Sequence, residues 1–575
     1  DQSVQRSLTT LLDEFDATGL RVLRSGLVFH ATEGAQLARS EISTVGAGSL
    51  LGIVLLVMLI FRSVWALLSI AIVLLASSVF AIATCLLVFD KLHLVTLAFG
   101  STLLGLAADY CFHFFSKWRA SGDAMLARDL VSRGVLLSLA SSAIAYLLQM
   151  ISPFPGLQQF AVFITAGLLM ACFTVLLVLP RLLAGKDLGG LRLSGLFNSV
   201  VLPLYRGLAV YRWPVISLLL VAQILALAWV ARQGVSDDIR LLNTSGDTLL
   251  TEERRVGELI EGINSQQFFI VKGNTQQEML EATEQLSIAL ASQLAGQVSQ
   301  AAGEDSVIST SLFSVAQFVP SLAQQRQDYR LIQDKIYGPD GALAALCRSG
   351  PSLCEQNKPE PLNFQSGLVP SHLTPELQQD LKLNALLADS FTIVLPLGDV
   401  LDAEPVVQLA NGLDAVDYVD NVQQLTGVLA QLRTQVSLIL IGFILCLACA
   451  SLYLFGRNGW PLIFSLLITV ILSLAVATAD GLTLFHVLAL LLVMGLTVDT
   501  SIFYIKLGFD LDTWLAAALS CGTSLLAFGL LSFSQVAVLE QFGSVVFWGL
   551  ICAWLLTPMV FCLMQNENNV RTQYA

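Results

Sequence analysis

The sequence predicts a polytopic α-helical membrane protein built from two parallel repeats of one helical module. Of its 575 residues, 55% are hydrophobic and 13% are charged, whereas soluble domains carry about 25% charged residues. Many apolar runs reach the roughly 20 residues that span a bilayer. Several short motifs also recur in the same order in the two halves of the chain.

Eleven runs are long and apolar enough to cross a hydrocarbon core of about 30 Å. They cover residues 45–61, 65–89, 93–116, 132–151, 158–180, 213–232, 436–455, 460–479, 483–507, 513–533 and 540–563. The chain opens on polar residues that resemble the middle of a folded region. We therefore expect a first span and most of a first outer domain to precede this sequence.

The distribution of Lys and Arg sets the predicted orientation. Basic residues in short loops mark the cytoplasmic side of a membrane protein. Nearly all of them fall on one side of the predicted spans, and the short loops on the other side contain a single basic residue, Lys91. The predicted cytoplasmic set is Arg62, Lys117, Arg119, Arg128, Arg133, Arg181, Lys186, Arg192, Arg206, Arg212, Arg457 and Lys506.

The long segment 233–435 then lies outside the cytoplasm. It holds 26 Asp and Glu against 11 Lys and Arg, which accounts for the net charge of −13 of the chain. This acidity is that of a solvated surface or of one that attracts cations. It argues against nucleic acid as a partner, because such binding depends on positive charge.

The outer segments have the pattern of α/β domains. Residues 267–273 (QFFIVKG) predict a strand and are followed by an amphipathic helix. Residues 391–398 and 415–420 predict strands that bracket a helix at 403–413. Residues 20–30 lead into a helix and a span in the same way as 415–420 do.

The predicted domains follow from these assignments. They are the end of a first periplasmic α/β domain (1–44), five spans of repeat 1 (45–180), a cytoplasmic amphipathic connector (181–212), the first span of repeat 2 (213–232), a second periplasmic α/β domain (233–435), five spans of repeat 2 (436–563) and a cytoplasmic tail (564–575).

The internal repeat rests on three ordered matches. GLAADYCFHFF from Gly105 matches GLTVDTSIFYI from Gly495, FRSVWALL from Phe61 resembles FGRNGWPL from Phe455, and SLASSAIAYLLQMIS from Ser138 matches SCGTSLLAFGLLSFS from Ser520. LQQF at 157–160 also matches LEQF at 539–542. Both copies run in the same direction, so the repeat is parallel.

Asp109 and Asp499 are the two carboxylates that fall in the middle of predicted spans, and the first alignment makes them equivalent. A charged side chain there costs roughly 2.5–3.5 kcal/mol on insertion scales, so it usually faces the bundle interior or a wet cavity. A buried carboxyl group can hold and release a proton. The alternative is that both aspartates only hold the bundle together by hydrogen bonds.

Other polar or small residues accompany this pair. Gly105 and Gly495 lie one turn before the aspartates and predict close helix packing. If the equivalent helices meet at a pseudo-twofold axis, Tyr110 reaches Asp499, while Thr500 is a shorter donor in the second copy. His113 either extends a proton path or is an ordinary interfacial histidine. Ser142 and Ser524, with their neighbours Ser141 and Thr523, either line a polar centre or pack as small residues.

Cys347 and Cys354 are the two cysteines of the outer domain, and the stretch CRSGPSLC predicts a disulfide between them if that side is oxidising. A metal or redox role lacks further ligands. We find no nucleotide-binding loop, metal-binding helix or nucleophilic serine motif. The sequence thus predicts neither an enzyme nor a cofactor or metal site.

The matched GLAADY and GLTVDT motifs, with α/β outer domains beside repeated helical blocks, resemble the RND superfamily of transporters. The likeness is closest to bacterial MMPL-type exporters, whose fourth and tenth helices carry a motif close to GxxxDY. The resemblance implies six-helix blocks, of which eleven spans are visible here, and porter-like periplasmic domains. It also implies a proton relay of Asp109, Tyr110 and Asp499, with Thr500 where a second tyrosine is expected.

The resemblance implies a proton-driven exporter of lipids or other hydrophobic molecules from the bacterial inner membrane. Its expected partners are a lipid-like substrate, protons and membrane lipids, and a homo-oligomer or a periplasmic accessory protein stays open. Two alternatives also stay open: a lipid- or sterol-sensing protein that does not transport, and an accessory motor for protein translocation.

Overall fold

The computed structural model describes residues 22–92, 96, 102–151, 155–184, 186, 195, 197–239, 245–259, 267–300, 311–349, 367–377, 379, 390–397, 403–479 and 481–564. The chain divides into two compact units. One, here the outer unit, comprises Asp1–Phe29 and Gly246–Leu425; the other, the membrane unit, comprises His30–Ser245 and Thr426–Ala575. Each is described by itself.

Repeat 1 of the membrane unit contains five long helices. They are α2 (Leu27–Phe61), α3 (Val64–Phe89), α5 (Thr102–Ser121), α6 (Ala124–Leu147) and α7 (Pro155–Phe173). A sharp turn separates the first two, with Arg62 at a φ of 48°. The predicted domain boundary at residue 44 lies inside α2.

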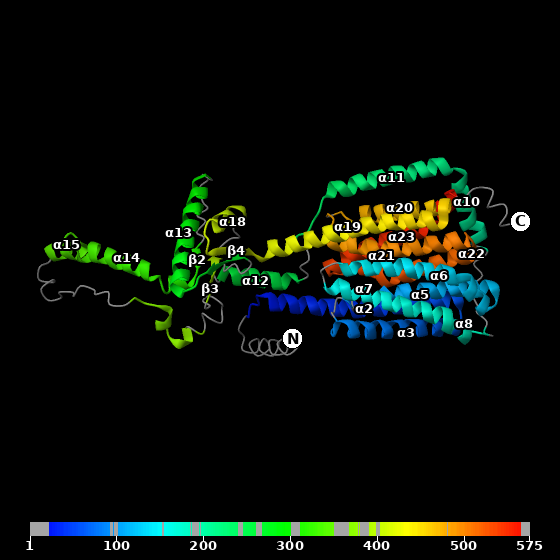
Figure 1. Ribbon diagram of the computed structural model, residues 1–575, viewed down its shortest axis with the longest axis horizontal. Coiled ribbons are helices and arrows are strands. Elements are labelled where there is room, and N and C mark those ends of the chain that lie inside the picture. Colours follow the sequence, from blue (N-terminus) through cyan, green and yellow to red (C-terminus); the bar gives the residue numbers. More distant parts are fainter. Residues whose placement is uncertain are drawn as a thin grey trace. The chain divides into compact units, whose positions relative to one another are not determined.

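Repeat 2 has one further helix at its start, α11, followed by five helices in the same order as those of repeat 1. Its helices are α11 (Arg212–Gln233), α19 (Asn421–Phe455), α20 (Trp460–Ala477), α21 (Leu484–Leu507), α22 (Leu511–Phe528) and α23 (Ala537–Met564). The predicted boundary at residue 435 falls inside α19. Figure 1 shows these helices running along one another in the membrane unit.

Nine segments among the described residues are long and apolar enough to cross a membrane. One of them, Asn421–Ala477, contains both α19 and α20, which a short turn at Gly456–Gly459 separates. Helix α5 is not among the nine, because Asp109, His113, Lys117 and Arg119 make it more polar than the others. The eleven predicted spans therefore correspond to eleven helices, and the chain is a multi-pass membrane protein.

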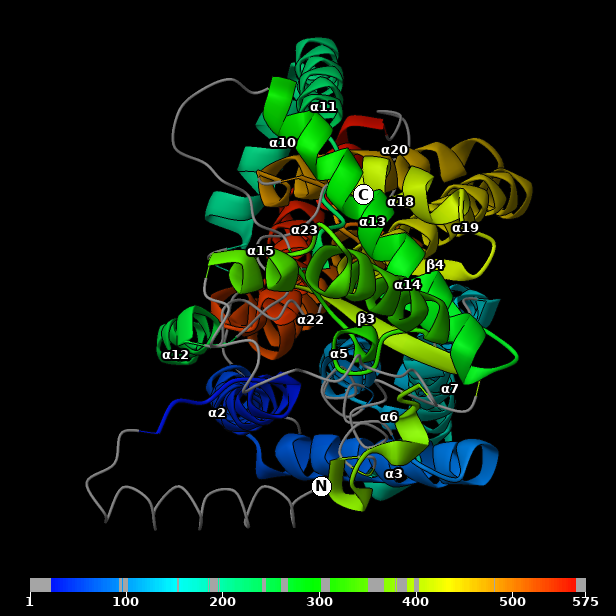
Figure 2. The same ribbon diagram turned by 90° about the vertical axis from the view of Figure 1, so that its left-hand side faces the viewer.

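Burial differs strongly among the helices. Of the most apolar stretch of 18 residues in each helix, 89% of the residues are buried in α21 and 11% in α11. Viewed end on, α3 and α11 lie at opposite edges of the membrane unit, with α22 and α23 between them (Figure 2). One apolar core joins residues of both repeats, such as Leu103, Ile164, Val493 and Phe528. The repeats therefore fold as one body.

The connector between the repeats is helical over residues 197–210. A π-helix, Phe197–Val201, continues into α10 (Leu202–Val210). Tyr205 is buried and its hydroxyl donates to the carbonyl of Leu555 on α23 at 3.3 Å. Its ring packs edge-on against Phe509 at 5.5 Å. The connector thus attaches to repeat 2 through one side, as an amphipathic helix would.

The outer unit contains a four-stranded antiparallel sheet in the order β2-β3-β1-β4. The strands are β1 (Gln267–Lys272), β2 (Ser311–Phe313), β3 (Phe391–Leu397) and β4 (Val416–Asp420). Helix α13 (Gln276–Gln300) connects β1 to β2, and α18 (Ala403–Asn411) connects β3 to β4. This is the ferredoxin-like βαββαβ arrangement, and the strands predicted at 267–273, 391–398 and 415–420 are present.

Apolar side chains from the sheet and both helices form the core of this unit, including Phe269, Val394, Leu286 and Val406. The outer unit also contains the helices α12 (Asp247–Leu259), α14 (Leu322–Ile332) and α15 (Ala342–Ser349). Cys347 on α15 is disulfide-bonded, and its predicted partner Cys354 lies outside the described residues. The eight other cysteines are free.

Candidate functional site

Each of the two helices that carry the aspartates packs against a helix of the other repeat, an arrangement called crosswise packing below. Helix α5 of repeat 1 packs against α22 of repeat 2, and α21 of repeat 2 packs against α6 of repeat 1. A Cβ atom placed on Gly105 would lie 3.4 Å from the Ser524 hydroxyl, and one on Gly495 would lie 3.8 Å from the Ser142 hydroxyl. Equivalent residues therefore meet across a pseudo-twofold axis.

Asp499 is bound by hydroxyl groups from the other repeat. Ser142 Oγ donates to the Asp499 carboxyl group, at 3.1 Å from Oδ2 and 3.3 Å from Oδ1. Ser141 Oγ lies 3.3 Å from Oδ1, but its single proton also reaches the Ser138 carbonyl at 2.9 Å. Ser142 is therefore the firmer donor.

Asp109 has a corresponding but weaker environment. It is 7% exposed, and the side chain of Ser520 on α22 lies beside its carboxyl group. Ser520 is the repeat equivalent of Ser138. No described residue hydrogen-bonds Oδ1 of Asp109, nor the hydroxyl of Ser524, the equivalent of Ser142. The two carboxyl groups thus differ in their hydrogen bonding.

The predicted partners Tyr110 and Thr500 do not bridge the two aspartates. The Tyr110 hydroxyl is buried and is hydrogen-bonded by no described residue, so the expected bond to Asp499 is not formed. Successive helix residues point about 100° apart, so Tyr110 and Asp109 lie on different sides of α5. Thr500 donates back to the carbonyl of Leu496 at 2.8 Å on its own helix.

His113 lies at the axis itself. Its imidazole stacks on the ring of Phe503, with centroids 3.4 Å apart and planes 12° from parallel. Phe503 occupies the equivalent position in the second GLTVDTSIFYI copy. Both side chains are buried, at 3% and 1% exposed. Of the two alternatives for His113, this burial under Phe503 does not fit an ordinary interfacial histidine.

Ion pairs fix the ends of these helices at the end of the bundle predicted to be cytoplasmic. Lys117 Nζ at the end of α5 lies 2.8 Å from Asp510 Oδ2, and Arg119 lies 3.4 Å from Asp512. Asp510 also caps α22 by accepting from the Thr513 amide at 2.7 Å. The start of α22 is therefore anchored to α5.

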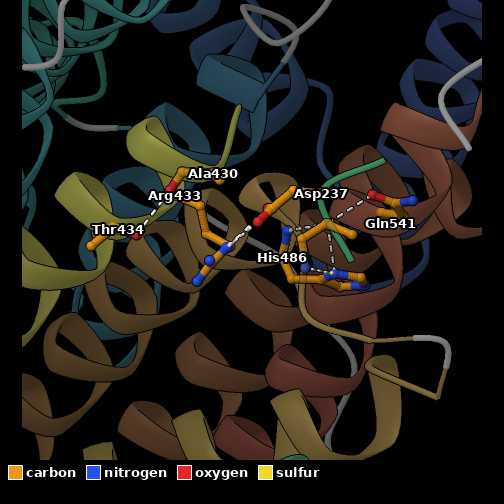
Figure 3. Close-up of polar contacts among 7 residues, drawn as sticks. Asp237, Ala430, Arg433, Thr434, His486 and Gln541 are labelled. Carbon is orange, nitrogen blue, oxygen red and sulfur yellow. Dashed lines mark hydrogen bonds and ion pairs between the residues drawn. The ribbon is translucent and has the colours of Figure 1, made fainter. Parts of the chain in front are cut away.

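A second polar network holds the opposite end of α21 (Figure 3). Thr483 caps this helix together with His486, whose Nδ1 lies 2.8 Å from the Thr483 hydroxyl. The same hydroxyl lies 2.8 Å from Oε1 of Gln541 on α23. In repeat 1, Thr96 donates to Gln159, the equivalent of Gln541, at 3.1 Å. The glutamine of LEQF thus ties the aspartate helix α21 to α23, and the glutamine of LQQF binds Thr96, which precedes α5.

Beside this network, Asp237 pairs with Arg433 of α19 (Figure 3), with Nε 2.9 Å from Oδ1 and 3.1 Å from Oδ2. The segment that carries Asp237 is held by backbone bonds between Ser236 and Leu482 and between Leu482 and Gly234, both 3.1 Å. A small cavity adjoins it, lined by Asp237, Thr483, Gln541 and their neighbours. The sequence contains no repeat or motif that would have revealed this ion pair.

No metal site accompanies these networks. Within the described ranges, no three or more His, Cys, Asp or Glu side chains lie close enough together to hold an ion. His93, which the sequence places near the start of α5, lies outside those ranges.

The fold has a clear counterpart among solved structures. The chain is similar to the hedgehog release protein Disp from the water bear Hypsibius dujardini, at a TM-score of 0.55 and 14% identity, over 92% of this chain and 71% of that one. The chain therefore shares the fold of that protein. No family model and no curated protein matches the sequence. At this identity the likeness concerns the fold alone.

Proposed function

We propose that this protein is a proton-driven exporter of lipids or other hydrophobic molecules, and not an enzyme. The observation that carries the proposal is the pair of equivalent carboxyl groups, buried Asp109 and half-buried Asp499, each placed against a serine of the opposite repeat. A carboxyl group that gains or loses a proton there changes its bonds across the interface. Proton binding is thereby coupled to the packing of the two halves.

The available energy is sufficient for export. A membrane potential of about 180 mV is worth about 4 kcal/mol per proton. That corresponds to almost a thousandfold concentration ratio of cargo for each proton. The proposed location is the bacterial inner membrane with periplasmic outer domains, as the basic loops and the MMPL-like motifs indicate. The proposed partners are protons, membrane lipids and a lipid-like cargo, and a second copy or an accessory protein would be compatible.

The test uses Asp109→Asn and Asp499→Asn, each reconstituted in vesicles made from the total lipid extract of the expressing membranes. Proton flux is followed with trapped pyranine under an imposed potential, and released lipid is collected and identified by mass spectrometry. Asn keeps the size of the side chain but cannot ionise, so we expect uncoupler-sensitive proton flux and lipid release to be lost in both variants.

Asp90→Asn is the matched control. Asp90 follows α3, is exposed and has a φ of 56°, a conformation that Asn also adopts. We expect it to transport as the unmodified chain does. Normal flux and release in both the Asp109 and the Asp499 variant would exclude proton coupling through this pair. That outcome would favour a lipid-sensing role, and a loss of protein secretion without lipid release would favour a translocation motor.

A further inference from the structure

One face of α5 carries a stripe of buried polar groups that starts at Asp109. Asp109, His113 and Ser116 are spaced four and three residues apart, so they lie on the same side of the helix. They are 7%, 3% and 1% exposed. No described residue hydrogen-bonds Asp109 Oδ1, His113 Nδ1 or Ser116 Oγ.

Buried polar atoms without a protein partner are costly, and in native proteins they are usually satisfied by ordered water. Three of them in line on one helix face therefore suggest a file of water molecules. The stripe also leads to an aqueous end. Lys117 follows Ser116 directly and pairs with Asp510, whose side chain is 39% exposed.

The equivalent face of α21 is interrupted. Phe503 stands where His113 stands on α5, and Lys506 stands where Ser116 stands. The Phe503 ring lies flat on the His113 imidazole at 3.4 Å and also contacts α6, where a Cβ atom on Gly134 would lie 2.9 Å from its edge. An apolar ring in this position interrupts the face of α21 that corresponds to the stripe. The buried hydroxyls of Ser501 and Tyr504, which no described residue hydrogen-bonds, lie on another side of α21.

Beyond the aspartates in the other direction, neither of these two helices continues the stripe. From Leu103 to Ala108 the described side chains of α5 are apolar, and Gly105 has no side chain. On α21, Leu488 to Leu496 are apolar, and the Thr497 hydroxyl donates to the carbonyl of Val493 at 2.7 Å. The polar stripe of α5 therefore runs from Asp109 toward the Lys117 end only.

We propose that the Asp109–His113–Ser116 face of α5 is the proton path between the aspartate pair and the end of the bundle that bears Lys117 and Asp510. Phe503 closes the matching route along α21, so both aspartates exchange protons with that end through α5. Neutral imidazole has one donor and one acceptor nitrogen. His113 can thus accept a proton on one nitrogen as it releases one from the other, with no net change of charge.

This inference rests on the proposed function, but water in the path can be tested without any transport. The variant Ser116→Cys is treated with the impermeant reagent MTSET in inside-out vesicles, where the Lys117 end faces the added reagent. Labelling of the peptide is followed by mass spectrometry. Because MTSET reacts with the hydrated thiolate, we expect labelling roughly tenfold faster than at an apolar buried site.

Ser77→Cys is the control for burial. Ser77 is also buried and unpartnered by described residues, but it lies on α3, away from the axis. Thr497→Cys tests the other direction and is expected to stay unlabelled. Equal labelling of Ser116→Cys and Ser77→Cys would overturn the path, whatever the aspartate variants do.

The use of the path is tested at His113, with proton flux into pyranine-loaded vesicles as the readout. His113→Phe repeats the residue of the second copy and keeps an aromatic stack, while His113→Gln keeps a donor and an acceptor. We expect His113→Phe to lower proton flux roughly tenfold or more and His113→Gln to restore most of it.

The outcomes separate the two proposals. Unchanged proton flux in His113→Phe would overturn the path even if Ser116→Cys is labelled. An equal loss of proton flux in His113→Phe and His113→Gln would also overturn it, because that result would indicate a packing role for His113. Normal flux in Asp109→Asn and Asp499→Asn would instead refute the proposed function, and the labelling result would still stand for the water file.

Discussion

The ion pair between Asp237 and Arg433 provides a quantitative test of the network at the outer end of α21. The side chains are only 10% and 17% exposed, and Arg433 Nε lies within 3.1 Å of both carboxylate oxygens. Asp237→Asn or Arg433→Gln leaves one charge buried without its counterion. Loss of one partner of a fully buried pair costs about 3–5 kcal/mol.

Because this pair keeps some contact with solvent, we expect each single substitution to cost about 2–3 kcal/mol of unfolding free energy, below the fully buried range. The double variant Asp237→Asn/Arg433→Gln removes both charges. It should therefore cost less than the sum of the single variants, with a coupling energy of about 1 kcal/mol or more.

The assay is unfolding by SDS in mixed micelles, followed by tryptophan fluorescence. Arg128→Gln is the control, because Arg128 pairs with Asp129 at 2.9 Å in the same unit, but both side chains are exposed. Its cost should stay within about 0.5 kcal/mol. Strict additivity of the Asp237 and Arg433 variants, or a cost no greater than that of Arg128→Gln, would refute the reasoning.

Two further predictions concern packing and ionisation. A Cβ atom on Gly549 of α23 would lie 2.5 and 2.6 Å from the methyl carbons of Val493, whereas at Gly495 the nearest atom is 3.8 Å away. Gly549→Ala should therefore cost about 1–3 kcal/mol of unfolding free energy, and Gly495→Ala should be neutral or slightly stabilising. Equal unfolding curves for the two variants would contradict this prediction. Burial raises the pKa of Tyr418 in the outer unit to about 12. Since its unfolded pKa is about 10, the contribution of Tyr418 to stability should be constant below pH 10 and be lost as the pH rises toward 12. Tyr418→Phe should reduce the fall in stability over this range, and an absorbance step for Tyr418 at pH 10 would count against the prediction.

The helices and strands could be predicted from the sequence because their signals are local. Apolar runs place the spans, and alternating residues such as those of QFFIVKG place strands that the structure confirms. The repeat also predicted which residues are equivalent. It could not predict which ones touch, because the copies pack crosswise, so Ser142 of repeat 1 binds the aspartate of repeat 2.

The site was predicted less well for the same reason. The expected bond from Tyr110 to Asp499 is not formed, because serines of α6 occupy the hydrogen-bonding positions of the Asp499 carboxyl group. For His113 the sequence left a proton path and an interfacial position open, and the stack on Phe503, which buries the imidazole, could not be foreseen from it. The pair of Asp237 and Arg433 joins positions 196 residues apart, and no sequence pattern links them.

The crosswise packing of the repeats has a consequence for biosynthesis. When repeat 1 leaves the ribosome, Asp109 enters the membrane together with the serines of α6, but Asp499 follows Ser142 only 357 residues later, and Ser520 comes later still. Until then a carboxyl group and its future partners lie in lipid without each other. The first half of the nascent chain should therefore depend on a membrane chaperone, or on water retained around α5, until the second half is inserted.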